Sequence, residues 1–219
     1  MTLPSISPII PVIPEKIFSE NAPQVAVNVL SALLIIGLSV LIAWTLSKVM
    51  KQSNIVSNPI VNMILAGTIG LAMFLRYGLT VTMLQGLFLF FVLLYASLSD
   101  LTTHTVDDSV WLIVSALALV SIPTIGLGTM CIGAFMVFVP QMALALIPPH
   151  RTLGGADIKL STALAFLLGT WRGLGAYLAG LLLAVVVMSI YNYKNKTENK
   201  QPFALVPFLS IGAMIAFFI

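Results

Sequence analysis

Long apolar runs separated by short polar breaks dominate the chain. Most runs are continuous, without the alternation of apolar and polar residues that indicates β-strands. About twenty apolar residues are needed for a helix to cross the hydrocarbon core of a bilayer. The pattern therefore predicts an all-α fold, a polytopic transmembrane helical bundle of about eight hydrophobic segments. These segments are residues 26–47, 60–75, 79–98, 110–127, 129–147, 158–169, 174–190 and 203–219.

Two segments and the N-terminus differ from this simple pattern. Pro123 is expected to kink or end the fourth segment, because proline lacks the N–H of a helix hydrogen bond. Segment 158–169 is marginal for a full crossing and is expected to be short, tilted or partly re-entrant. Residues 1–25 are predicted to be a proline-rich tail without an evident signal peptide, followed by one transmembrane domain over residues 26–219.

Composition supports the membrane class. Of the 219 residues, 59% are hydrophobic and 8% are charged, whereas about a quarter of the residues in an average soluble domain are charged. Backbone groups in hydrocarbon must be paired internally, so helices are the spanning structures that fit these continuous runs. The single cysteine, Cys131, excludes an intrachain disulfide framework and a CxxC-type zinc site.

The distribution of lysine and arginine predicts the orientation, because cytoplasmic loops of membrane proteins carry an excess of these residues. With the N-terminus outside and eight crossings, the loops predicted to be cytoplasmic contain Lys48, Lys51, Arg151, Lys159, Lys194, Lys196 and Lys200. The outside segments contain Lys16, Arg76 and Arg172. This orientation also places two acidic loops, around Asp100 and Asp157, on the cytoplasmic side of an inner membrane.

Four aspartates at the membrane edge are the candidates for chemistry, because ionisable groups near hydrocarbon are costly and usually functional. They are Asp100, Asp107, Asp108 and Asp157. From the residues alone, Asp100 could equally be a solvated boundary acid and Asp157 a plain helix N-cap. The adjacent Asp107 and Asp108 are expected to cap the fourth segment rather than to catalyse.

Glycines precede Asp157 in the sequence Leu-Gly-Gly-Ala-Asp-Ile-Lys-Leu. Gly154 and Gly155 would let a substrate backbone approach closely, because glycine tolerates conformations that other residues avoid. An aspartate in a first helical turn also suits the positive end of the helix dipole.

These residues resemble the type IV prepilin peptidase family. Residues 97–108 are similar to its first signature, with Asp100 at the end of a span and Val106 and Asp108 matching, although Asp107 replaces a proline. Residues 154–160 resemble the GxGDxKL signature. Gly154, Asp157, Lys159 and Leu160 match, while Ala156 replaces the second glycine. The runs Pro202-Phe203-Ala204 and Pro207-Phe208 resemble the start of the family's last span.

The resemblance implies a GxGD-type aspartyl endopeptidase that needs no cofactor. Its partners would be membrane lipid and pilin-like precursors with basic leader peptides, cut at the cytoplasmic membrane face, and no nucleic acid. Asp100 and Asp157 would form the catalytic pair; Gly154, Gly155, Lys159, Asp107 and Asp108 would support it or bind substrate. Residues 48–59 contain no cysteine-rich domain, so the chain resembles the shorter Tad-type or archaeal peptidases, and N-methylation is not expected.

Three other interpretations remain open from the sequence. His104, His150 and the four aspartates could form a metal site or the mouth of a cation transporter, although no HExxH spacing is present. An intramembrane protease of the presenilin or signal-peptide-peptidase type also uses a GxGD motif, but the nearest run to its Pro-Ala-Leu is Pro202-Phe203-Ala204-Leu205. The third interpretation is an inactive structural protein of a secretion complex.

Overall fold

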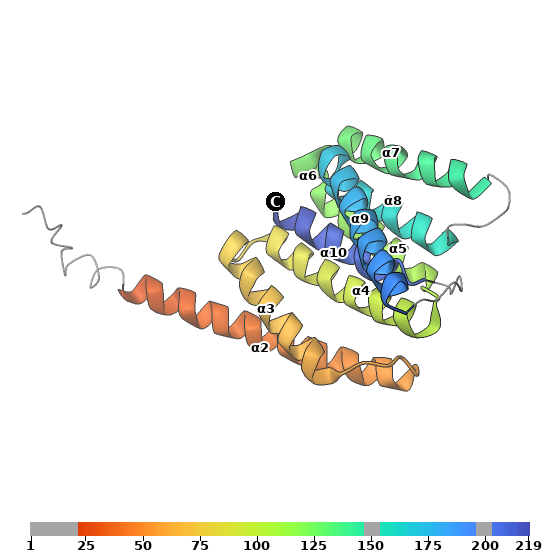
Figure 1. Ribbon diagram of the computed structural model, residues 1–219. Helices are drawn as coiled ribbons and strands as arrows, with labels where there is room; N and C mark the ends of the chain where they lie inside the picture. Colours follow the sequence, from red (N-terminus) through yellow and green to blue (C-terminus); the bar gives the residue numbers. More distant parts are fainter. Residues whose placement is uncertain (1–21, 147–153, 196–202) are drawn as a thin grey trace, which may run out of the picture.

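The computed structural model describes residues 22–146, 154–195 and 203–219, which form helices joined by short turns (Figure 1). The all-α prediction is confirmed for this part of the chain. Of the predicted proline-rich tail, residues 1–21 lie outside the described ranges, and residues 22–25 belong to the first described helix. The helices are α2 (Ala22–Gln52), α3 (Pro59–Tyr77), α4 (Val81–Thr103), α5 (Asp108–Ala118), α6 (Ile122–Ile125), α7 (Leu127–Leu146), α8 (Gly155–Leu168), α9 (Thr170–Asn195) and α10 (Val206–Phe218).

Six segments in the described residues are long and apolar enough to cross a membrane. They are α2, α3, α4, α7, α9 and the stretch from α5 to α6. Helix α8 has 14 residues and α10 has 13, so both are shorter than a standard span. The expectation of about eight hydrophobic segments, with a short one at residues 158–169, therefore agrees with the structure.

The fourth predicted segment is interrupted, as expected from Pro123. Helix α5 ends at Ala118, a single 3-10 turn covers Leu119–Ser121, and α6 begins with Pro123 in its first turn. A proline is tolerated there because the first N–H groups of a helix have no partner within the helix. Gln85 of α4 donates from Nε2 to the Leu117 carbonyl at 2.8 Å and to Ser121 Oγ at 2.7 Å. This side chain ties the interruption to the neighbouring helix.

Large apolar side chains cover both the inside and the outside of the bundle. Leu89, Leu93, Leu160 and Leu167 are buried between the helices. Many others are exposed along the outer faces, such as Leu34 of α2, which is 66% exposed. Exposed apolar surface of this extent is unfavourable in water and is expected where a protein faces lipid.

Buried polar side chains connect several pairs of helices. Asn62 of α3 donates to Ser47 of α2 at 2.9 Å, and Gln141 of α7 donates to Ser161 of α8 at 2.8 Å. In a bilayer such bonds satisfy groups that have no water available, and each contributes about 0.6–2 kcal/mol to helix association. The second bond joins α7 to α8 close to Asp157, so it bears on the placement of the candidate site.

Three helix ends meet at one end of the bundle. Helix α4 runs toward the right in Figure 1, whereas α8 and α10 both begin near that end and run back toward the left. Helix α10 packs against both α4 and α8. The last turn of α4 and the first turns of α8 and α10 thus bring residues near positions 100, 157 and 206 into one region.

Candidate active site

Asp100 is buried in the last turn of α4, and its carboxylate has a backbone donor. The residue is 7% exposed, and its Oδ2 accepts a hydrogen bond of 3.0 Å from the Val206 N–H. Val206 is the first residue of α10, where backbone N–H groups lack partners within the helix. His104 ends α4 in a left-handed conformation, with φ of 52°. Asp100 is therefore fixed at the junction of two helices and is not a freely solvated boundary acid.

Asp157 lies in the first turn of α8, where the N-cap residue is Gly154. The alternative that Asp157 is itself a plain N-cap does not hold, because Asp157 stands three residues after the N-cap. A backbone hydrogen bond from Gly154 reaches the Asp157 carboxylate, which is the reciprocal half of a capping box. A Cβ at position 154 would lie 2.9 Å from Asp157 Oδ2, so a larger residue there would displace the Asp157 carboxylate.

The electrostatics of Asp157 indicate that its carboxyl lies close enough to Asp100 for the two charges to interact. Asp157 is partly buried on a helix that is not among the six long spans. Burial raises the pKa of its carboxyl to about 6, the negative charge of Asp100 adds to the rise, and the Gly154 hydrogen bond opposes it. Two nearby carboxylates do not ionise together easily, so such a pair tends to hold one proton between them.

Gly155 and Ala156 directly precede Asp157, where the family resemblance implies close approach of a substrate backbone. A Cβ added at Gly155 would meet no atom within 4 Å, so packing does not require glycine there. Both residues are at least partly accessible at the start of α8. The backbone beside Asp157 is therefore open, which is compatible with an approaching peptide.

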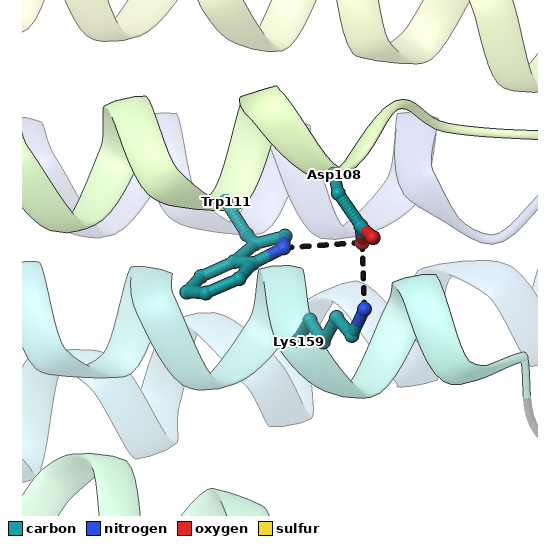
Figure 2. Close-up of polar contacts among 3 residues, drawn as sticks. All are labelled: Asp108, Trp111 and Lys159. Atoms are coloured by element: carbon teal, nitrogen blue, oxygen red, sulfur yellow. Dashed lines mark hydrogen bonds and ion pairs between the residues drawn. The ribbon is translucent and has the colours of Figure 1, made fainter.

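Asp107 and Asp108 do not cap α5 as predicted. Asp107 occupies the N-cap position, but its side chain makes no capping hydrogen bond. Its Oδ2 instead accepts a bond of 2.8 Å from the Tyr95 hydroxyl of α4. Asp108 Oδ1 accepts bonds from Lys159 Nζ at 2.6 Å and from Trp111 Nε1 at 3.1 Å (Figure 2). The capping interpretation failed because better donors come from neighbouring side chains.

The described residues contain no group of three or more histidine, cysteine, aspartate or glutamate side chains able to hold a metal ion. His104 is exposed at the end of α4. His150, the other histidine of the metal interpretation, lies outside the described ranges. The described part of the chain therefore offers no support for a metal site.

Several contributors to the site were not identified from the sequence. Val206 acts through its backbone N–H, which no side-chain motif reveals. Tyr95 acts through a contact that depends on the turn between α4 and α5. Trp111 had a detectable signal, because it follows Asp108 by three residues, the spacing of neighbours on a helix face.

The long apolar helices define the class of the chain as a multi-pass helical membrane protein. Residues 87–193 match the family model described as the type IV leader peptidase family. This segment runs from within α4 to near the end of α9, and its similarity to that family indicates a peptidase. The matched residues include Asp100 and Asp157. No curated protein and no solved structure matches the chain significantly.

Proposed function

We propose that the chain is an aspartyl endopeptidase that removes basic leader peptides from pilin-like precursors at the cytoplasmic face of the inner membrane. The observation that carries the proposal is the placement of buried Asp100 in the last turn of α4 and partly buried Asp157 in the first turn of α8, both within the residues that match the leader peptidase model. The charge of Asp100 and burial also raise the pKa of Asp157. A shared proton is what a two-carboxylate peptidase needs. Similarity to the type IV leader peptidase family supports the substrate class.

The proposed mechanism divides acid and base between the two aspartates. In this mechanism Asp157, whose pKa is raised to about 6, holds the proton. Asp100 takes a proton from water as the water oxygen attacks the scissile carbonyl carbon, and Asp157 donates its proton to the carbonyl oxygen. The tetrahedral intermediate then collapses. Asp100 returns its proton to the departing amine, and the hydroxyl proton of the intermediate goes back to Asp157.

Cleavage of a precursor tests the proposed function directly. The detergent-solubilised protein is incubated with a co-expressed pilin-like precursor, and mass spectrometry follows the loss of the leader peptide. The expected product is the mature protein with a new N-terminus at the leader junction. A precursor that stays intact with the wild-type protein, under conditions where the protein is folded, would contradict the function.

The rate of cleavage should fall as the pH rises above about 6. The pKa of Asp157 is raised, so its carboxyl remains protonated to a higher pH than an ordinary aspartate, and the general acid is lost once the pH passes about 6. Initial rates measured from mildly acidic to mildly alkaline pH give kcat/KM as a function of pH. A rate that increases steadily through neutral pH would show that Asp157 is not the proton donor.

The proposed orientation predicts which positions react with an impermeant thiol reagent applied to intact cells. The control position is Leu79, which is 68% exposed between α3 and α4 and is proposed to face outward. Tyr193, 90% exposed near the end of α9, is proposed to face the cytoplasm. In a Cys131→Ser background, Leu79→Cys should be labelled, and Tyr193→Cys should be labelled after permeabilisation alone. The reverse pattern would invert the orientation.

A further inference from the structure

A short ion pair links α5 to α8 beside the candidate site. Lys159 Nζ lies 2.6 Å from Asp108 Oδ1, and the same oxygen accepts the Trp111 Nε1 hydrogen bond at 3.1 Å. The Lys159 ammonium also lies 5.8 Å from the centroid of the Trp111 ring. Figure 2 shows the three side chains converging between the two helices. The carboxylate of Asp108 is therefore already engaged within the protein.

This pair acts on α8 from the side opposite Asp157. Successive residues of an α-helix are rotated by about 100°, so Lys159 projects about 200° around the axis from Asp157. Ser161, about 40° from Asp157 by the same geometry, exchanges hydrogen bonds with Gln141 of α7 at 2.8 and 3.1 Å. Helix α8 is thus held by α5 on one side and by α7 on another, which restricts rotation about its axis.

The position of the Asp157 carboxylate depends on that restriction, because Asp157 lies in the first turn of α8. Gly154 and Gly155, three and two positions before it, give the backbone little intrinsic stiffness. Buried apolar neighbours, Ile158 and Leu160, hold the helix in the bundle, and the more exposed ion pair adds a contact of defined direction to α5. A rotation of α8 would swing the Asp157 carboxylate away from Asp100.

We propose that Lys159 and Asp108 form a positioning pair, which fixes the rotation of α8 and thereby aims Asp157 at Asp100. The proposal rests on the peptidase function proposed above. It differs from a role of Asp108 in binding substrate, because the positive partner of Asp108 is the protein's own Lys159. Lys159 and Asp108 do not touch the reacting atoms in this arrangement; they act through Asp157.

Kinetics separate positioning from substrate attraction. Lys159→Met and Asp108→Asn should each lower kcat by about 10- to 100-fold with little change in KM, because small displacements of a catalytic group have effects of that size. Lys159→Arg, which keeps the ion pair, should restore most of the rate. Asp107→Asn is the matched comparison, since it removes an adjacent acid bonded to Tyr95 and not to α8. It should raise KM by up to about fivefold and spare kcat.

If Asp108→Asn raised KM as much as Asp107→Asn and kept the wild-type kcat, the positioning role would be overturned and substrate attraction favoured. Cleavage by Lys159→Met at the wild-type rate would also overturn the positioning role. These outcomes require a wild-type protein that cleaves precursor, so a second measurement without substrate is needed to keep the two proposals separate.

The titration of Asp157 supplies that measurement in the full-length protein in detergent. Carboxyl-labelled aspartate is followed by carbon NMR, and the Asp157 signal is identified by its loss in Asp157→Asn. Removal of the Lys159 charge would by itself raise the pKa of Asp157. Loss of positioning would instead lower the pKa of Asp157, because its carboxyl would become more hydrated and move away from Asp100.

We therefore expect the pKa of Asp157 in Lys159→Met to fall below its wild-type value of about 6. A higher pKa, the sign expected from loss of the Lys159 charge alone, would overturn the positioning role, whether or not the wild-type protein cleaves precursor. A lower pKa in a protein that never cleaves precursor would retain the helix-positioning effect and reject the peptidase function.

Discussion

Replacing either Asp100 or Asp157 with asparagine should reduce cleavage by about a thousandfold or more while the protein still inserts and folds. Asparagine keeps the shape of the side chain but cannot take up and release a proton in this chemistry. The double variant should be no slower than either single variant, because residues that act as one unit are not additive. Precursor processing by the purified variants, followed by mass spectrometry, measures the effect.

The hydrogen bond to Asp100 provides a matched control for folding. The Asp100→Asn side chain can still accept the Val206 N–H through its amide oxygen, whereas Asp100→Ala cannot. The alanine variant should therefore lose about 1 kcal/mol of stability in addition to activity, the size of a lost helix cap. An asparagine variant at either position that processes precursor at the wild-type rate would refute the catalytic pair.

Gly212→Val should lower stability more than Asp100→Ala does, because it separates α10 from α9. A Cβ at position 212 would overlap the Ala176 carbonyl oxygen and lie 2.9 Å from the Gly180 amide nitrogen. These are backbone atoms, so the clash can be relieved only if the helices move apart. We expect a cost of about 3 kcal/mol or more, measured as a lower unfolding midpoint in detergent.

Gly175→Ala is the control for the glycine prediction, because a Cβ there meets no atom within 4 Å. In the interior of α9 this change should be neutral or stabilising, since alanine favours helix by about 1 kcal/mol over glycine. Equal unfolding midpoints for Gly212→Val and the wild type would show that the α9–α10 contact contributes little to the fold.

The spans were predictable because hydropathy alone determines which segments can enter a bilayer. The uninterrupted apolar runs locate α2, α3, α4, α7 and α9, and Pro123 marks the interruption after α5. Helix ends were less accurate. The first predicted span covers residues 26–47, whereas α2 extends over Ala22–Gln52, because polar residues such as Lys51 continue the helix at the membrane edge.

The members of the candidate site were predictable, but their partners were not. Asp100 and Asp157 stand out because acids are rare in an apolar chain, and the charge of Asp100 acts on the Asp157 carboxyl. Lys159 stands out as part of a motif, but its partner Asp108 is 51 residues away. Val206 is 106 residues from Asp100, and its contribution comes from a backbone group. Such pairings depend on how helices pack, which local patterns in a single sequence do not encode.

The hydrogen bond between Asp100 and Val206 also determines when the site can form during biosynthesis. The two residues are 106 positions apart, which at about 5–20 residues per second corresponds to roughly 5–20 seconds of translation. During that interval α4 can enter the bilayer, but no α10 amide is present to donate to the Asp100 carboxylate. The nascent chain consequently carries an Asp100 carboxylate without its backbone donor until Val206 has left the ribosome and α10 has docked against α4.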